Sequence, residues 1–178
     1  MFELFGMTNL DVELSELALL LKNNNSKFIL IGSGKNYHIA TLVTKVANSY
    51  GLKWFSLDAG QALHGDIGIV NKKDIICYVS KSGNTQEIFD CAVYLKDILS
   101  VSVTYNPDCL IKKFCKLNIF LPIEKEYSVF EKAPMYSSIV TIIFFYKLIN
   151  VISKDKTPNE YFVNHPSGQI GMSIGIDK

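Results

Sequence analysis

The chain has 178 residues, a length that suits one ordinary domain and is too short for two comfortable ones. Its formal net charge is +1 and its sequence pI is about 7.6, so it carries no large basic field with which to hold nucleic acid. Its basic residues are all Lys and none is Arg, which excludes the bidentate hydrogen bonding of a guanidinium to a phosphate group. A bound phosphate would therefore have to be held by backbone N–H groups, hydroxyls, Lys or a helix N-terminus.

The N-terminal segment predicts a helix rather than a targeting signal. It has no cationic start followed by an apolar core and a small-residue cleavage site, and Leu14, Leu17 and Leu21 follow the spacing of an amphipathic helix. The most apolar later stretch, residues 139–152, contains Lys147 and is too short to span a bilayer. We therefore expect a soluble, cytoplasmic protein without contact to a membrane.

Short apolar runs alternate with helical patterns along the chain. The runs predict five strands, over residues 27–31, 52–57, 74–79, 98–104 and 117–121. Helical patterns follow most of them, at residues 38–50, 86–97, 109–114 and 134–153. Because the runs are apolar throughout, the strands are expected to be buried on both faces. The sequence thus predicts one α/β domain over residues 1–178, a three-layer αβα, flavodoxin-like fold with a doubly wound five-stranded parallel sheet.

The third run ends at a polar loop, which we call the serine loop (residues 80–85). Its side chains belong to Ser80, Lys81, Ser82, Asn84 and Thr85, with Gly83 among them. Hydroxyls and backbone N–H groups at the N-terminus of a helix can bind phosphate. The alternative is a plain helix cap, because Ser and Asn cap helices without any ligand. Three hydroxyls at one junction exceed what capping requires.

The first run ends at a turn, Gly32–Lys35, that matches neither a Walker A motif nor a dinucleotide-binding fingerprint. Lys35 at the start of the next helix opposes the helix dipole, which hints at a nearby anion. A solvated Lys is the simpler explanation when this turn is taken alone.

Histidines and glutamates stand in polar segments beside the apolar runs. His64 and His165 could transfer protons, or could bond to the backbone of their own loops. Glu87 sits in the first turn after the serine loop, where it is also a favourable helix-start residue. Glu124 and Glu126 follow the fifth run at the same expected edge of the sheet. Paired carboxylates at one pocket suit removal of a proton next to a carbonyl group.

Metal binding is not expected. The cysteines have no close-pair spacing, and no two histidines have ligand spacing. The residues concerned are Cys77, Cys91, Cys109, Cys115, His38, His64 and His165. We expect reduced, mostly buried thiols and no metal.

Taken in this order, the segments resemble the sugar isomerase (SIS) domain, and within it the arabinose 5-phosphate isomerases. The resemblance covers about residues 29–170 and rests on the segments 31–39, 62–70, 80–87, 124–126 with 133–134, and 164–171. It implies a catalytic set of one Lys, two Glu and two His, matched here by Lys35, His64, Glu87, Glu126 and His165. It also implies a substrate- and phosphate-binding set, matched by Gly34, Asn36, Ser80, Ser82, Gly83, Asn84 and Thr85, with Ser137 and Ser138 as helpers.

The resemblance implies reversible conversion of D-arabinose 5-phosphate into D-ribulose 5-phosphate through an enediol, without a metal or another cofactor. This reaction would feed synthesis of the eight-carbon sugar acid Kdo for lipopolysaccharide or capsule. Lys35 would polarise the sugar oxygens, Glu126 or Glu87 would move the proton between C1 and C2, and His64 or His165 would assist ring opening. Related enzymes are tetramers that share residues between sites, so the expected partners are a sugar phosphate and further copies of the chain. The regulatory CBS pair of many relatives is not expected.

Three other interpretations stay open. An SIS isomerase could act on a hexulose or heptulose phosphate, although the segment around His64 argues against this. An SIS domain could also serve as a non-catalytic sugar-phosphate sensor, although retention of all five catalytic residue types favours an enzyme. A flavodoxin-like domain could bind another anion. The isomerase accounts for the combination of motifs best.

Overall fold

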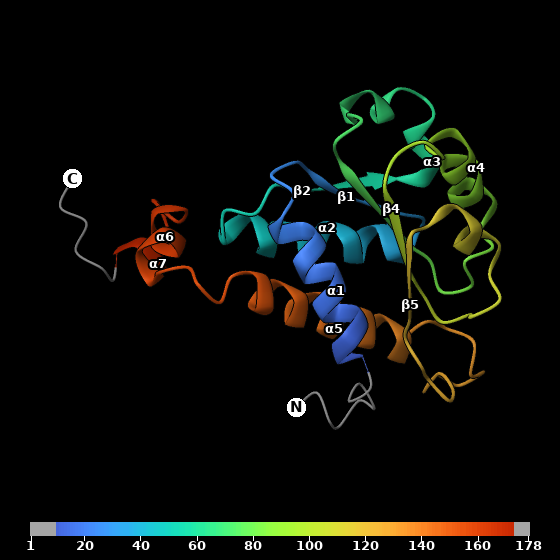
Figure 1. The fold of residues 1–178 in the computed structure, drawn as a ribbon. Coiled ribbons are helices and arrows are strands. Elements are labelled where there is room, and N and C mark those ends of the chain that lie inside the picture. Colours follow the sequence, from blue (N-terminus) through green and yellow to red (C-terminus); the bar gives the residue numbers. More distant parts are fainter. Residues whose placement is uncertain (1–9, 173–178) are drawn as a thin grey trace.

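The computed structural model of the protein describes residues 10–172, which contain one parallel sheet of five strands (Figure 1). The strands are β1 (Phe28–Gly32), β2 (Trp54–Asp58), β3 (Ile75–Val79), β4 (Ser100–Thr104) and β5 (Leu117–Phe120). They lie in the order β2-β1-β3-β4-β5, and every neighbouring pair is parallel. The chain therefore winds from β1 to one edge of the sheet and then back across to the other, as the doubly wound prediction requires.

Helices cover both faces of the sheet (Figure 1). One face is covered by α1 (Asp11–Lys22), α2 (Lys35–Ser49) and α5 (Tyr136–Ile152). The other is covered by α3 (Ala59–Ala62), α4 (Gln86–Tyr94) and the short 3₁₀ helices η3 (Asp66–Ile69) and η4 (Leu110–Phe114). Successive side chains of β1 alternate between the two cores, as Phe28 faces the first and Ile29 the second. The three-layer α/β prediction is confirmed.

The three central strands are buried throughout, whereas the two edge strands are not. Every residue of β1, β3 and β4 is buried. In β2 and β5, by contrast, Phe55 is 43% exposed and Phe120 is 38% exposed. The expectation that all five strands are buried on both faces is wrong for these two, because an edge strand has a neighbour on one side only.

Two short helices, α6 (Pro158–Val163) and α7 (Gln169–Met172), follow α5 and lie at the left of Figure 1. The ring of Tyr161 in α6 packs on the ring of Tyr50, with 4.7 Å between the ring centroids. Tyr50 directly follows the last residue of α2, so the C-terminal segment contacts the end of α2 that lies furthest from Lys35. Within residues 10–172, no helix combines the length and the apolar character needed to cross a membrane.

Candidate functional site

The loops that follow β1, β2, β3 and β5 all emerge at the carboxyl edge of the sheet, because the strands are parallel. The strand register aligns Gly32 of β1 with both Asp58 of β2 and Val79 of β3. The turn before α2, the segment after β2 and the serine loop therefore start side by side. Parallel α/β folds bind their ligands at this edge.

The serine loop is anchored by its carbonyl groups to the segment between β4 and η4. Three successive carbonyl oxygens of the loop accept hydrogen bonds at 3.0–3.3 Å from residues 104–111. The Lys81 oxygen accepts from the Tyr105 N–H and from the Thr104 hydroxyl. The Ser82 oxygen accepts from Asn106 Nδ2, and the Gly83 oxygen accepts from the Ile111 N–H. In a trans peptide plane the carbonyl and the following N–H point in opposite directions. The anchoring therefore turns N–H groups of the loop away from β4 and η4.

Inside the loop, the hydroxyls brace the backbone. Ser80 Oγ is buried, accepts a hydrogen bond from Gly83 N at 3.0 Å and lies 3.2 Å from Thr85 Oγ1. Ser82 is exposed, and its Oγ accepts from Asn84 N at 3.1 Å, which leaves the hydroxyl proton for a ligand. Thr85 precedes α4 but does not cap it with its side chain. The first-turn N–H groups of α4 can therefore bind an anion.

The turn before α2 brings two stretches of backbone into close contact. A Cβ atom at Gly32 would lie 2.7 Å from backbone atoms of Asn36 and Tyr37, so a side chain there would push β1 away from α2. Gly34 has a φ of 56°, a left-handed conformation that favours glycine. Lys35 is exposed and makes no hydrogen bond or ion pair with the residues that the structure describes. Its ammonium group is therefore available at the carboxyl edge.

Glu126 is buried beneath the N-terminus of α5. Its Oε2 accepts hydrogen bonds from the backbone N–H groups of Met135, Tyr136 and Ser137 at 3.0, 2.8 and 3.1 Å. Its Oε1 accepts from Lys81 Nζ at 2.6 Å and from the Ser137 hydroxyl. Burial by itself would raise the pKa of Glu126, but the hydrogen bonds from Lys81 and Ser137 outweigh burial and lower the pKa to about 2. The carboxylate caps α5 and joins it to the serine loop.

The two serines at the start of α5 already use their hydroxyl protons. Ser137 donates to Glu126, and Ser138 donates to the backbone oxygen of Pro134. A hydroxyl has a single proton, so neither is a free donor for a phosphate in this arrangement. The hydrogen bonding gives no support to the expected helper role of Ser137 and Ser138.

Glu87 and His64 have a different environment from that of Glu126. Both are exposed, and neither side chain forms a hydrogen bond or ion pair with the described part of the chain. Glu87 lies in the first turn of α4, directly after the serine loop, and His64 follows α3. An unpaired carboxylate, an imidazole and the ammonium group of Lys35 thus follow three strands, β3, β2 and β1, that end at the same edge of the sheet.

Lys81 is a further candidate site residue, to which the motifs assign no role. It stands inside the serine loop, and its ammonium group reaches Glu126, 45 positions further along the chain. The sequence does carry a signal for it. In a chain without Arg, a Lys within the phosphate motif is the local cation.

His165 lies at the opposite edge of the sheet. Its Nδ1 is 2.9 Å from the backbone oxygen of Tyr161, and its neighbour Asn164 donates to the backbone oxygen of Ser49 at 3.0 Å. Ser49 is the last of the 15 residues of α2, and a helix of that length spans about 22 Å from Lys35. Within one chain, the structure therefore separates His165, in the segment between α6 and α7 (Figure 1), from the other four catalytic candidates.

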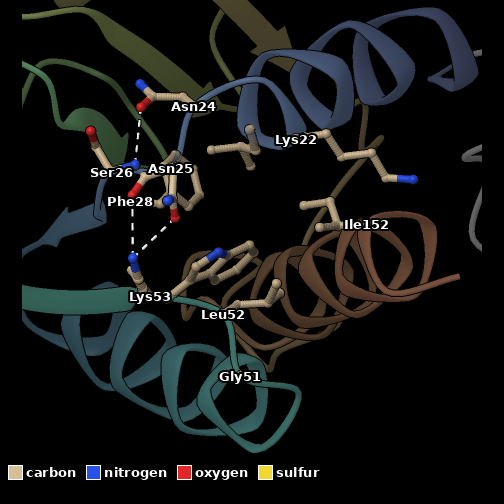
Figure 2. Close-up of a pocket in the computed structure, with 11 residues that line it drawn as sticks. Lys22, Asn24, Asn25, Ser26, Phe28, Gly51, Leu52, Lys53 and Ile152 are labelled. Carbon is tan, nitrogen blue, oxygen red and sulfur yellow. Dashed lines mark hydrogen bonds between the residues drawn. The ribbon is translucent and has the colours of Figure 1, made fainter. Parts of the chain in front are cut away.

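A hollow of about 260 Å³ also lies at this amino edge, between the ends of α1 and α5 and the loops before β1 and β2 (Figure 2). Lys53 Nζ in its wall donates to the side-chain oxygen of Asn25 at 3.0 Å, and Lys22 pairs with Asp155 at 3.0 Å. These polar groups are satisfied within the protein, and none belongs to the carboxyl-edge site. Among residues 10–172, no three His, Cys, Asp or Glu side chains gather closely enough to hold a metal ion.

Known proteins share this fold. The family model of the SIS domain matches residues 20–151, most of the chain. The chain belongs to the SIS-domain family. This confirms the resemblance that the motifs predict. The arabinose 5-phosphate isomerase KdsD of Francisella tularensis is 29% identical to this SIS chain over 162 residues, which cover 88% of the chain and 50% of the relative. The SIS chain thus spans about half the length of the curated relatives it matches.

Solved SIS-type structures agree with the arrangement. The Escherichia coli CFT073 protein c3406, solved in complex with arabinose 5-phosphate, superposes with a TM-score of 0.86 at 28% identity, over 92% of this chain and 89% of that chain. MJ1247 of Methanococcus jannaschii, for which a 3-hexulose-6-phosphate isomerase function is inferred, superposes with a TM-score of 0.72 at 20% identity, over 89% of this chain and 88% of that chain. The second likeness shows the fold alone.

Proposed function

We propose that this SIS domain is an aldose–ketose isomerase that interconverts D-arabinose 5-phosphate and D-ribulose 5-phosphate, for the supply of Kdo. The observation that carries the proposal is the position of Glu87. This unpaired carboxylate lies in the first turn of α4, directly after the serine loop, so a phosphate held by the loop brings the attached sugar beside it. The similarity to the KdsD relative and to the protein solved with arabinose 5-phosphate supports the choice of sugar.

In the proposal, the phosphate group lies over the serine loop. It accepts hydrogen bonds from the hydroxyls of Ser82 and Thr85 and from the first-turn N–H groups of α4. Ser80 keeps the loop in shape from below, because its buried hydroxyl holds Gly83 N at 3.0 Å. The backbone of Gly34 and Asn36 borders the same edge from β1.

The chemistry is a proton transfer between two carbons. Glu87 removes the proton from C2 of the open-chain aldose, and the C–H electrons form the C1–C2 double bond of an enediol as O1 gains a proton. Glu87 then delivers the proton to C1, and O2 gives up its own proton as it becomes the ketone oxygen. Lys35 stabilises the negative charge that develops on the sugar oxygens. His64 carries the proton between O1 and O2, because an imidazole changes its charge near neutral pH.

The position of His165 adds a partner to the proposal. Within one chain it lies at the amino edge, about the length of α2 away from Lys35. If His165 acts on the sugar, it does so in the site of another copy of the chain. We therefore propose an oligomer, with four chains as the expected size, in which each site takes His165 from a neighbour.

A hexulose phosphate is the alternative substrate, in line with the function inferred for MJ1247. The two sugars place C1 and C2 at different distances from the phosphate group. A substrate comparison at equal concentrations distinguishes them. A non-catalytic sensor would bind both sugars and convert neither.

The deciding experiment is proton exchange followed by NMR, with D-arabinose 5-phosphate in deuterated water and a metal chelator. The proposal predicts ribulose 5-phosphate as the product and deuterium at C2 of the recovered substrate. Binding of the sugar without exchange would contradict the proposal and favour a sensor. Exchange with a hexulose phosphate alone would contradict the choice of sugar.

A further inference from the structure

We infer that Lys81 and Glu126 form a clamp that holds the serine loop against the N-terminus of α5, and that both act as positioning residues for phosphate binding. In this inference Glu126 takes no part in proton transfer. The inference rests on the proposed function for the identity of the phosphate ligand, but the clamp itself is a property of the folded chain.

The first step is the saturation of Glu126. Its side chain is buried, with 2% of the residue exposed, and its two oxygens accept five hydrogen bonds. An ionised carboxylate has about four lone-pair sites, so no site is left to receive a proton from a sugar carbon. Protonation of Glu126 would also weaken the cap on α5 and the ion pair with Lys81. A general base needs the opposite properties, which Glu87 has.

The second step is the double anchoring of Lys81. Its backbone oxygen is held from the β4 side, by Tyr105 N at 3.0 Å and by the Thr104 hydroxyl at 3.2 Å. Its side chain reaches the other way and donates to Glu126 Oε1 at 2.6 Å. The loop is therefore fixed to β4 by its backbone and to α5 by one side chain. Removal of the Lys81 side chain would free the second attachment only.

The third step concerns charge. Glu126 is a buried anion, and Lys81 is the cation within ion-pair distance of it, with its own side chain 37% exposed. Loss of one partner leaves a buried charge without its counterion, which costs more than loss of both. The two residues should therefore be strongly coupled in a double-mutant cycle. A pair of independent surface residues would give additive effects.

The consequence for function is preorganisation. In the proposed function the anion is held by short hydroxyl side chains of the serine loop and by the first-turn N–H groups of α4, which must point to one place before the ligand arrives. A clamp across the loop holds that geometry. The ammonium of Lys81 also places positive charge next to the phosphate, and its two remaining protons can serve the ligand. Loss of the clamp should therefore weaken phosphate binding more than it slows the chemical step.

The test uses five variants: Lys81→Met, Glu126→Gln, the double variant of both, Lys81→Arg, and Lys125→Met as the matched control. Lys125 is the neighbour of Glu126 in sequence, is exposed and pairs with the exposed Glu131 at 3.1 Å. For each variant we would measure the affinity for inorganic phosphate by calorimetry and amide hydrogen exchange of residues 80–85 and 135–137. The kinetic constants kcat and KM for D-arabinose 5-phosphate complete the set.

The clamp predicts that Lys81→Met and Glu126→Gln each lower the phosphate affinity at least ~10-fold and speed exchange in both segments, while kcat changes less than ~3-fold. The phosphate affinity of the double variant should be no lower than that of whichever single variant binds phosphate less tightly. Lys125→Met should have the phosphate affinity, hydrogen exchange and kinetic constants of the wild type. Lys81→Arg should retain the affinity to within ~3-fold, which separates the clamp from a failure to fold.

Two outcomes would overturn the inference. Loss of kcat in Glu126→Gln with normal phosphate affinity and normal exchange would make Glu126 a proton-transfer group. Additive losses in the double variant would show that the two residues act independently. A wild-type protein that converts no sugar phosphate would refute the proposed function, whereas phosphate affinity and exchange would still test the clamp.

Discussion

Gly83 stands against Cys109 so closely that a Cβ atom at Gly83 would lie 2.3 Å from Cys109 Cβ and 2.7 Å from its Sγ. Gly83 also has a φ of 63°, in the left-handed region that favours glycine. The contact seats the serine loop on the segment before η4, whose Ile111 N–H holds the Gly83 carbonyl. The same glycine thus satisfies the backbone geometry and the close packing that shape the serine loop.

Gly83→Ala should therefore destabilise the fold and distort the serine loop. The left-handed conformation costs about 1–2 kcal/mol for a residue with a Cβ atom, and the overlap with Cys109 adds about 1–3 kcal/mol. Urea unfolding would measure the loss. The control is Gly168→Ala, where the nearest atom lies 4.0 Å from the added methyl group. Equal stability of the two variants would contradict the close contact.

Glu126 should make stability depend on pH in the acid range. Its pKa falls from the ordinary value of 4.5 to about 2 in the folded state, so the folded chain binds fewer protons there than the unfolded chain. The stabilisation is present in full above pH 4.5 and is lost as the pH falls towards 2. The difference in pKa corresponds to about 3 kcal/mol.

The measurement is the free energy of unfolding of wild type minus that of Glu126→Gln, from urea unfolding at several pH values and constant ionic strength. The difference should shrink by about 3 kcal/mol between pH 6 and pH 2. A difference that stays constant over this range would show that Glu126 has an ordinary pKa.

Glu87→Gln should abolish turnover and spare binding. The amide keeps the size of the side chain but cannot take a proton, so kcat should fall about 10²- to 10⁴-fold. Calorimetry with D-arabinose 5-phosphate should give an affinity close to that of wild type. The control is Glu124→Gln, another exposed glutamate after β5. A Glu87→Gln enzyme with normal kcat would remove Glu87 from the chemistry.

His165 should act in the site of a neighbouring chain. Glu87→Gln and His165→Ala are each expected to be inactive, yet co-expression of the two chains should recover about a quarter of the wild-type activity. If each site combines Glu87 of one chain with His165 of a neighbour, random mixing of the two variants puts an intact Glu87 and an intact His165 together in about one site in four. Mixed oligomers confirmed by mass spectrometry that remain inactive would contradict the sharing of His165.

Much of the fold follows from local pattern. The apolar runs predict all five strands because each run is long enough to cross a buried sheet and is bounded by polar residues. The burial of β2 and β5 is not predicted correctly. Phe55 and Phe120 are exposed because these two strands lie at the edges of the sheet. Strand order arises from the packing of the whole chain, so the residues of one strand do not show which strands lie beside it in the sheet.

The family, the fold and the edge at which four of the five catalytic candidates lie can be predicted from local pattern, because strand ends, glycine turns and the serine loop are short-range features. The environment of each candidate was decided by tertiary structure alone. Glu87 and Glu126 are the same residue type, yet one is exposed and the other is buried under α5 and paired with Lys81. His165 was expected beside the other candidates from its motif, but it lies at the opposite edge. Such differences arise from contacts between segments far apart in the chain, and those contacts exist only once the chain has folded.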